Sequence, residues 1–236
     1  AVVCGGSEVS VVDVAARAEI DTFDLGHDCQ VVDICDDGSV LVGWISISDN
    51  GRRVRRLEID GAGQLSDTGE SITPDFPVNV HCAPGSNTAL ILQLGFDVTS
   101  IAVAGLGTRD QVTTATAPGS AIFQPDQGRV SIRAEGAIDV YDYDTASGVL
   151  SDTPALTIPG TGSLVPMGGI DTMAADPSTG LLYVTDDDTL GIYDATTGSA
   201  ATPIVKPGAD FTGVCFGGDS SIFSDGFESG DTGAWS

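Results

Sequence analysis

Basic residues are scarce in this sequence, and Lys206 is its only lysine. Nine lysines and arginines stand against 34 aspartates and glutamates, so the 236 residues carry a formal net charge of −25. Proteins that bind nucleic acid draw much of their affinity from basic side chains that release counterions, and binding to an anionic bilayer needs the same groups. The composition therefore excludes a reader of the phosphate backbone and a protein that adheres to anionic lipid.

Long apolar runs are also missing. No run approaches the roughly 18–20 residues that a membrane-spanning helix needs, so we expect no membrane span. Helix-period patterns are scarce, whereas short alternating or β-branched runs separated by Gly, Asp and Pro occur along the whole chain. Because 41% of the residues are apolar, the chain can bury a core. These patterns predict an all-β protein.

The sequence has no Cys-x-x-Cys pair and only two histidines, His27 and His81. Zinc sites usually combine closely spaced cysteines or histidines, so we expect no zinc site and assign no metal ligand. Scattered cysteines favour disulfides in an oxidising compartment with one thiol left over, and the alternative is buried, inert cysteines. The five are Cys4, Cys29, Cys35, Cys82 and Cys215.

The chain also lacks a signal peptide and starts directly with a strand-like run, as a mature exported chain would after processing. An acidic, lysine-poor surface suits a protein that must stay soluble outside the cell. Disulfides, charge and the form of the N-terminus together predict an extracellular protein, either secreted or held at the cell surface.

Two kinds of turn recur with a period of roughly 44 residues. The first has hairpin chemistry and follows a short apolar run. The second follows a strand that ends in a small or acidic residue, at positions 13, 60, 104, 144 and 194, which are 47, 44, 40 and 50 residues apart. Units of this length are typical of propeller blades with about four strands each. The first kind comprises Asp36–Gly38, Pro84–Asn87, Pro125–Gly128 and Asp176–Gly180.

The two chain ends together supply one further unit. Phe211–Phe216 provides a first strand only, and the N-terminus provides the strands that follow it. A later unit can be laid over the N-terminus without a gap, which places Thr185 on Cys4 and Asp194 on Asp13. We therefore predict a five-bladed β-propeller over residues 1–220, its last blade closed by N-terminal strands plus a C-terminal inner strand, because closure removes open sheet edges.

This shared blade predicts a disulfide between Cys4 and Cys215, because the strands that carry them would be neighbours. The bond would lock the ring. Cys35 and Cys82 occupy matching positions before the first turns of adjacent units and are the second candidate pair. Cys29–Cys82 is a rival pairing, since connectivity does not follow from sequence alone.

Residues 175–185 and 190–198 read ADPSTGLLYVT and LGIYDATTG, and they resemble the YVTN-type β-propeller repeat. Val9–Val14 looks like the second half of the same repeat. The resemblance implies a secreted or surface-bound bacterial protein, and some relatives are lactonases. Those lactonases typically have seven blades, whereas this chain has room for five, so we carry over no catalytic residue.

The last 15 residues, from Ile222, resemble a recurring C-terminal tail of secreted Gram-negative proteins, which contains Asp-Gly-Phe-Glu-Ser-Gly-Asp and ends near a tryptophan. We treat residues 221–236 as a separate tail. Its apolar residues Phe223, Phe227 and Trp235 are spaced so that an extended segment could press them into grooves or a sheet edge. Insertion against a neighbouring copy would build a fibre, and packing along its own domain is the alternative.

Calcium is the most reasonable inorganic ligand for so acidic a chain, because calcium prefers oxygen donors. Two acidic clusters are weak candidates, and neither has the spacing of an EF-hand loop. Solvated turn residues are the commoner explanation of such clusters. The first cluster is Asp186, Asp187 and Asp188, and the second is Asp225, Glu228 and Asp231 in the tail.

Four of the nine basic residues lie within five positions: Arg52, Arg53, Arg55 and Arg56. They either balance neighbouring acids on a solvated hairpin or form a contact surface for an acidic partner, including another copy of the chain. His81 could meet Cys35 across neighbouring units, and a hydrogen-bonded histidine near the propeller axis is the favoured interpretation.

No Gly-x-Ser-x-Gly motif is present, and 34 acidic residues make any carboxylate pair uninformative. The leading hypothesis is therefore an extracellular structural or interaction module without a cofactor, which assembles with other copies or binds an extracellular protein. The alternative is a secreted enzyme or ligand-binding module, lactonase-like or carbohydrate-directed, that acts at the propeller mouth. Aromatic residues, at 6%, are few for a protein that stacks sugars.

Overall fold

The computed structural model of this chain describes residues 1–46, 51–161, 172–176, 179–186 and 188–207. These residues form twenty β-strands in five antiparallel sheets, with only two short 3-10 helices, η1 (Ala104–Leu106) and η2 (Pro125–Gln127). The predicted all-β fold is confirmed. In four of the five sheets the strands pair strictly in chain order, and every sheet is built from one continuous stretch of sequence.

The first three sheets each end before the next begins. Sheet 1 contains β1 (Val2–Gly5), β2 (Glu8–Asp13) and β3 (Ala18–Asp24). Sheet 2 contains β4 (Cys29–Ile34), β5 (Ser39–Ser46), β6 (Gly51–Ile59) and β7 (Leu65–Ile72). Sheet 3 contains β8 (Pro77–Cys82), β9 (Thr88–Gln93), β10 (Asp97–Ala102) and β11 (Thr108–Thr113).

The last two sheets follow the same plan. In sheet 4 both of the last two strands pair with the third. Sheet 4 contains β12 (Pro118–Gln124), β13 (Arg129–Ala134), β14 (Ala137–Asp144), β15 (Val149–Leu150) and β16 (Leu156–Pro159). Sheet 5 contains β17 (Met173–Ala175), β18 (Leu181–Asp186), β19 (Thr189–Asp194) and β20 (Ile204–Val205).

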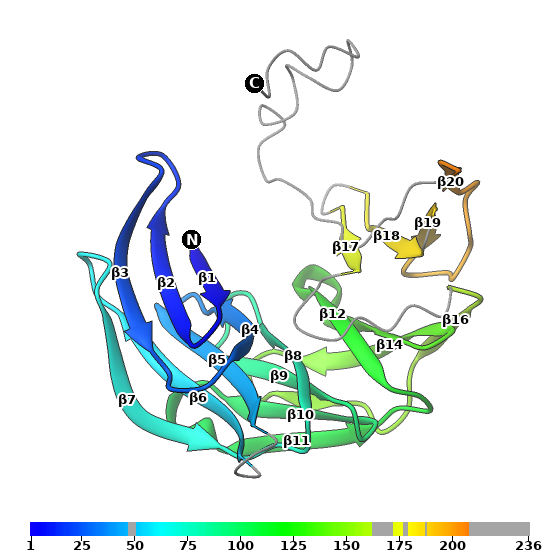
Figure 1. Cartoon of the computed structure of the whole chain (residues 1–236). Coiled ribbons are helices and arrows are strands. Elements are labelled where there is room, and N and C mark those ends of the chain that lie inside the picture. The colour runs from blue at the N-terminus through cyan, green and yellow to red at the C-terminus, as the bar shows by residue number, and fades with distance from the viewer. Residues whose placement is uncertain (47–50, 162–171, 177–178, 187, 208–236) are drawn as a thin grey trace, which may run out of the picture.

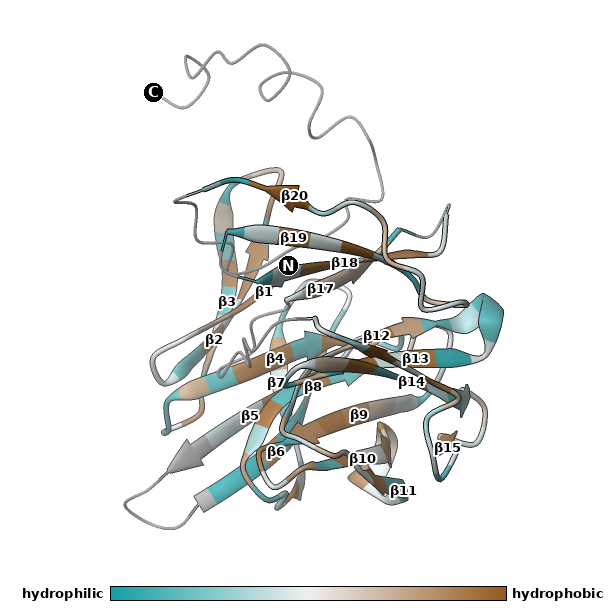
Figure 2. Ribbon diagram, turned by 90° about the vertical axis from the view of Figure 1, so that its right-hand side faces the viewer, coloured by the Kyte–Doolittle hydropathy of each residue, from teal (hydrophilic) through white to brown (hydrophobic). Residues whose placement is uncertain are grey.

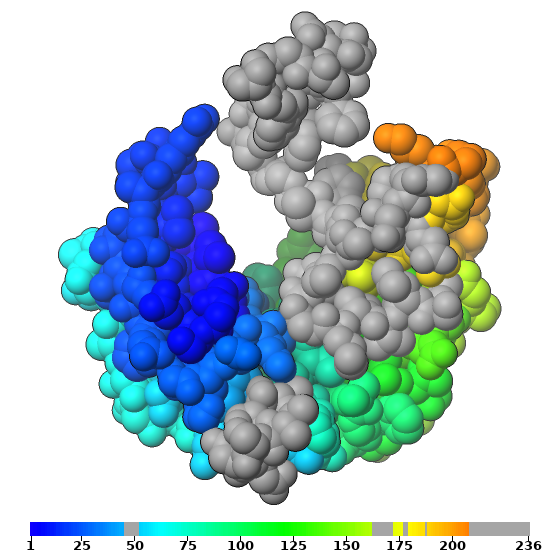
Figure 3. Space-filling model, viewed as in Figure 1, coloured from blue at the N-terminus to red at the C-terminus, as the bar shows by residue number. Residues whose placement is uncertain are grey.

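The five sheets follow one another around an arc (Figure 1). Their first strands lie towards the middle of this arc, where β4 contacts β8, β8 contacts β12 and β12 contacts β17. The described parts of sheet 1 and sheet 5 stand on either side of an opening (Figure 3). The described residues therefore do not close a ring, and the predicted closing strand, Phe211–Phe216, lies outside them.

The first predicted set of turns lies at strand ends, where the hairpin clusters connect the first and second strands of sheets 2 to 5. In the second set, positions 13, 144 and 194 are the last residues of β2, β14 and β19, position 60 directly follows β6, and position 104 is the first residue of η1. Aspartate suits these ends because its carboxylate caps the following turn. Asp194 Oδ1, for example, accepts hydrogen bonds from the amides of Thr196 and Thr197 at 2.7 and 3.0 Å.

The gapless overlay of the N-terminus on a later unit is confirmed by strand register. Cys4 pairs with Val9 in sheet 1, as Thr185 pairs with Leu190 in sheet 5. Since both pairs are separated by the same five residues, β1 and β2 correspond to β18 and β19. Sheet 1 therefore has second, third and fourth strands, and no first strand among the described residues.

A separate hydrophobic cluster fills each junction between successive sheets. Leu57, Leu41, Leu90 and Leu182 are fully buried members of the four clusters, in chain order of the junctions. Figure 2 shows the matching hydrophobic segments along β9, β14 and β18. Burying one such side chain contributes roughly 1.5–3 kcal/mol, so inter-sheet packing is the main source of stability.

Two disulfides cross between neighbouring sheets. Cys35 bonds to Cys82, as predicted, with the Cα atoms 5.1 Å apart. Cys4 bonds to Cys29, with the Cα atoms 5.6 Å apart, so the predicted Cys4–Cys215 bond is wrong. The physical reason is side-chain direction. Side chains stand perpendicular to their own sheet, so Cys4 meets the first strand of sheet 2 rather than a strand beside β1. Cys215 itself lies outside the described residues.

Candidate functional site

Polar side chains on the first strands hydrogen-bond to the backbone of the next sheet. Asp33 Oδ2, on β4, accepts a hydrogen bond from the amide of Cys82 at 2.7 Å. On β8, Asn79 Nδ2 donates to the carbonyl of Gly119 at 3.3 Å. These groups satisfy buried backbone atoms at the junctions, which is the ordinary task of polar residues inside a protein.

His81 also belongs to this set. Its side chain is 9% exposed, and its Nε2 accepts a hydrogen bond from the amide of Ala121 at 3.2 Å. Because Nε2 accepts, the proton of the neutral imidazole is on Nδ1. His81 is thus a hydrogen-bonded histidine near the middle of the arc, which agrees with the favoured sequence interpretation.

His27 lies in a different environment, in the connection between sheets 1 and 2. Its ring stacks on Trp44, with the centroids 5.4 Å apart and the planes 11° apart. The guanidinium of Arg55 lies 5.4 Å from the Trp44 ring on β5. This stack is next to the Cys4–Cys29 bond, since Cys29 pairs with Trp44 across β4 and β5.

Four carboxylates accept backbone hydrogen bonds from the next sheet, a role that sequence reasoning missed. Three of them lie on outer strands, and Asp36 lies in the turn between β4 and β5. The bonds join residues 35 to 49 positions apart, close to the repeat length, and that spacing is the signal that could have located them. The pairs are Asp21 with the Leu65 amide at 2.7 Å, Asp36 with Gly85 at 2.5 Å, Glu70 with Gly105 at 3.0 Å, and Asp110 with Leu150 at 2.8 Å.

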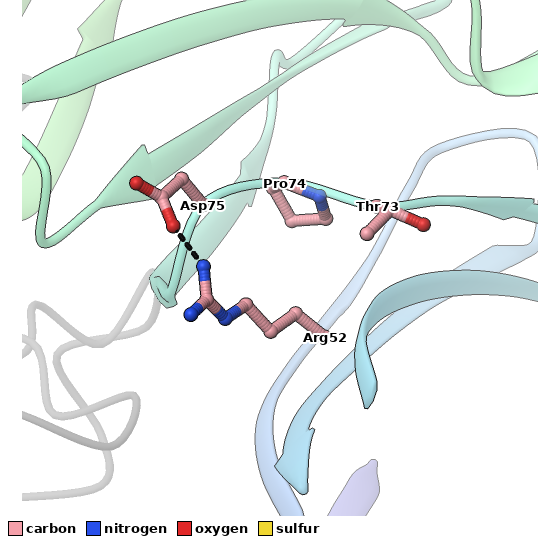
Figure 4. Close-up of a pocket in the computed structure, with 4 residues that line it drawn as sticks. All are labelled: Arg52, Thr73, Pro74 and Asp75. Carbon is pink, nitrogen blue, oxygen red and sulfur yellow. Dashed lines mark hydrogen bonds and ion pairs between the residues drawn. The ribbon is translucent and has the colours of Figure 1, made fainter. Parts of the chain in front are cut away.

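The four clustered arginines lie on β6, and each has a partner within sheet 2 or the connection that follows it. Arg52 forms an ion pair with Asp75 (Figure 4), and Arg53 donates to Thr73 Oγ1 at 2.6 Å. Arg55 lies 3.6 Å from a carboxylate oxygen of Asp67. Arg56 bonds to both Glu70 and Glu58, at 2.6 and 2.7 Å. This pattern matches a hairpin whose arginines balance neighbouring acids.

The Arg56–Glu70 contact is the best-formed of these ion pairs. Its hydrogen bond lowers the pKa of Glu70 and raises that of Arg56, and the Gly105 amide lowers the pKa of Glu70 further. Glu70 therefore links β6 to sheet 3 through one carboxylate.

A cavity of about 210 Å³ opens beside the Arg52–Asp75 pair. Figure 4 shows its four lining residues, with the guanidinium of Arg52 turned towards Asp75 from the opposite wall. The guanidinium carbon also lies 3.5 Å from the centre of the Phe76 ring. Both charged groups of the cavity are thus already paired with each other. Its remaining linings, Thr73 and Pro74, supply no general base for a nucleophile.

The proposed calcium ligands are only partly described. Asp188 Oδ1 accepts a hydrogen bond from Thr189 Oγ1 at 3.2 Å, and Asp186 is half-buried at the end of β18. Within the described part of the chain, no group of three His, Cys, Asp or Glu side chains is placed to hold a metal ion. The other candidates, together with the predicted assembly residues, lie outside the described residues: Asp187, Asp225, Glu228 and Asp231, and Phe223, Phe227 and Trp235.

The fold is similar to that of a solved structure, but no family is indicated for this chain. No protein-family model matches it, and no curated protein matches it. Among solved structures, it is similar to a functionally unknown protein from Desulfotomaculum acetoxidans DSM 771, with a TM-score of 0.62 and 18% identity over 90% of this chain and 83% of that one. At this identity the likeness concerns the fold alone. No helix among the described residues is long and apolar enough to cross a membrane.

Proposed function

We propose that this chain is an extracellular structural or interaction module, a five-bladed β-propeller of YVTN-type repeats that associates with other copies through its C-terminal tail. The observation that carries the proposal is that sheet 1 has no first strand among the described residues. In this proposal Phe211–Phe216 occupies that position, and residues 221–236 are then free to bind a neighbouring copy.

Sheet 5 supplies the template for the missing strand. There β17 pairs with β18 through Met173 and Val184, and the Thr185 amide donates to the Thr172 carbonyl at 3.0 Å. The corresponding edge of β1 has no strand beside it among the described residues, and Val3 on β1 is 50% exposed. An unpaired edge of this kind favours addition of a strand.

The faces that would meet on closure also carry apolar side chains. On sheet 5, Leu190 and Ile192 are half-buried and alternate with the residues that pack against sheet 4. On sheet 1, Val3 and Val12 lie on the face opposite to the Cys4 side chain. A fifth junction between these faces would add to the four that are already packed.

An extracellular location is supported by the two disulfides, since such bonds persist in oxidising compartments. Disulfides between sheets suit a protein that must keep its shape where no chaperone refolds it. A fibre-forming role follows from the tail, because insertion of one copy's tail into the next gives a heterologous contact that does not close on itself.

Two truncations test the proposal and separate its parts. A chain ending at residue 207 lacks the closing strand and the tail, and we expect it to unfold at a markedly lower temperature than the full chain. A chain ending at residue 220 keeps the closing strand, so it should retain the full unfolding temperature but stay monomeric by light scattering and electron microscopy. Equal stability of the 1–207 and full chains would refute closure, and assembly by the 1–220 chain would refute the role of the tail.

A further inference from the structure

One arginine of this chain is buried and lies in the interior between sheets 4 and 5. Arg133, on β13, is 1% exposed. Its guanidinium donates hydrogen bonds to the carbonyls of Thr161, Thr172 and Thr185 at 3.0, 3.2 and 2.7 Å. These carbonyls come from three separate segments, so the side chain holds the first two strands of sheet 5 and the end of sheet 4 around one charge.

Four buried polar atoms on Arg133 and on residues next to it have no hydrogen-bond partner within the part of the chain that the structure describes. They are Nε of Arg133 itself and the hydroxyl oxygens of Ser120, Thr161 and Thr172. Ser120 lies directly opposite Arg133 in the β12–β13 ladder, so the two side chains share one face of the sheet. Thr161 and Thr172 are held against the guanidinium by their own carbonyls. Unpartnered polar atoms are rare in protein interiors, and four on residues that pair with or contact Arg133 point to a bound species that supplies the missing partner.

The charge of Arg133 is poorly balanced by the residues that the structure describes. It forms no ion pair among them, and Asp186 acts on it only at longer range. Burial lowers the pKa of Arg133, and this outweighs the opposite effects of Asp186 and Tyr193. A buried charge without a counter-charge is costly.

We propose that Ser120, Arg133, Thr161 and Thr172 bind one small monovalent anion, such as chloride, in the interior between sheets 4 and 5. The donor set fits an anion, because the Nε–H group can only donate and each hydroxyl can turn its proton inward. A cation would be repelled by the guanidinium. A water molecule would satisfy the hydrogen bonds but leave the charge unbalanced. A bound anion makes the stability of the fold depend on the anion in solution, whereas a bound water does not.

Thermal unfolding of the full chain tests the site. At a fixed sodium concentration, replacement of gluconate by chloride should raise the unfolding temperature of the wild type, and the gain should saturate as binding to the folded state saturates. Bromide should act in the same way. The same titration followed by ³⁵Cl line broadening reports binding directly.

Three variants make the test specific. Ser120→Ala and Thr172→Val each remove one hydroxyl and should weaken chloride binding at least about tenfold, the usual effect of losing a hydrogen bond to a charged group. Arg129→Gln is the matched control, because Arg129 lies on the same strand but forms a surface ion pair with Asp142. It should bind chloride as the wild type does. A chain whose stability is the same in chloride and gluconate, or a Ser120→Ala variant with wild-type affinity, would overturn the proposal in favour of a buried water.

Discussion

The carboxylate of Asp33 accepts a hydrogen bond from the amide of Cys82, the same residue whose sulfur is bonded to Cys35. Asp33 near the end of β4 and Cys35 just after it thus hold the end of β8, one through a hydrogen bond and one through a covalent bond. The junction between sheets 2 and 3 is therefore fixed at its inner end both by a charged acceptor and by a disulfide. Hydrophobic packing is not directional, so these two bonds fix the position of sheet 3 relative to sheet 2 at that point.

Replacement of Asp33 by alanine should lower the free energy of unfolding by about 1–3 kcal/mol, because it leaves the Cys82 amide without its charged acceptor. Denaturation in urea at pH 7 measures the change. Asp152→Ala is a suitable control, since Asp152 is an exposed aspartate outside the strands. Equal stability of the two variants would show that the hydrogen bond contributes nothing at this junction.

The two disulfides should each stabilise the fold appreciably. They join residues 25 and 47 positions apart, for which the chain-entropy model gives about 3.5 and 4 kcal/mol. The paired replacements Cys4→Ala with Cys29→Ala, and Cys35→Ala with Cys82→Ala, should lower stability by amounts of this order in urea denaturation.

Peptide mapping without reduction checks the connectivity itself. The two bridges among the described residues use four of the five cysteines, so we expect Cys215 to be a thiol. A thiol reagent should therefore label the unfolded wild type once and the Cys215→Ser variant not at all. A recovered peptide that joins Cys4 to Cys215 would contradict the connectivity described here.

Turns and strand register could be predicted from the sequence because they are local properties. The overlay of Thr185 on Cys4 needed only the count of residues between strand pairs, and the structure keeps that count. The disulfide partner of Cys4 could not be predicted in the same way. It depends on which sheet the side chain faces, and a strand pattern does not specify how successive sheets stack.

Arg133 shows the same limit at a candidate site. In the run Arg129–Ala134 the polar residues alternate with Val130 and Ile132, which is the pattern of a strand with one buried face and one face exposed to solvent. In this fold both faces of sheet 4 are covered by neighbouring sheets, so the polar face is buried as well. The sequence pattern is that of an exposed arginine, and only the stacking of sheets makes Arg133 an interior charge.

A side chain at Gly148, in the turn between β14 and β15, should destabilise the fold. This residue has a φ of +78°, and an added Cβ would lie 2.9 Å from Ser100 Oγ and 3.1 Å from a methyl carbon of Thr88 in sheet 3. Gly136 is a matched control, because its φ is +80° and an added Cβ would meet nothing within 4 Å. Gly136→Ala should cost about 1 kcal/mol through backbone strain alone. Gly148→Ala should cost at least about 1 kcal/mol more, measured by urea denaturation. An equal loss of stability in the two variants would mean that the side chains of Ser100 and Thr88 move away from the added methyl group without loss of stability.

Arg17 occupies the corresponding place in sheet 1, four residues after Asp13, as Gly148 follows Asp144 and Gly198 follows Asp194. Its φ is +52°, a conformation that glycine adopts without strain. Arg17→Gly should therefore stabilise the fold, by up to about 1 kcal/mol, and raise the unfolding temperature. Arg17→Ala keeps a Cβ and should give no such gain, so a similar rise in both variants would point to the lost charge instead.

Acid should weaken the link between sheets 2 and 3 through Glu70. Its folded pKa is lowered from the usual 4.5 by the hydrogen bonds from Arg56 and the Gly105 amide. A lowered folded pKa means that the stabilisation is fully present above pH 4.5, the unfolded value, and is lost as the pH falls through the folded value. Glu70→Gln should thus be less stable than the wild type at pH 7, and the difference should shrink steadily below pH 4.5.

Urea midpoints between pH 7 and pH 3 measure this difference. Glu135→Gln is the control, because it removes the same charge at an exposed position. Both variants lower the repulsion within the acidic chain equally, so this effect cancels when their stabilities are compared. A Glu70→Gln variant that parallels Glu135→Gln at every pH would exclude Glu70 as the acid-sensitive group.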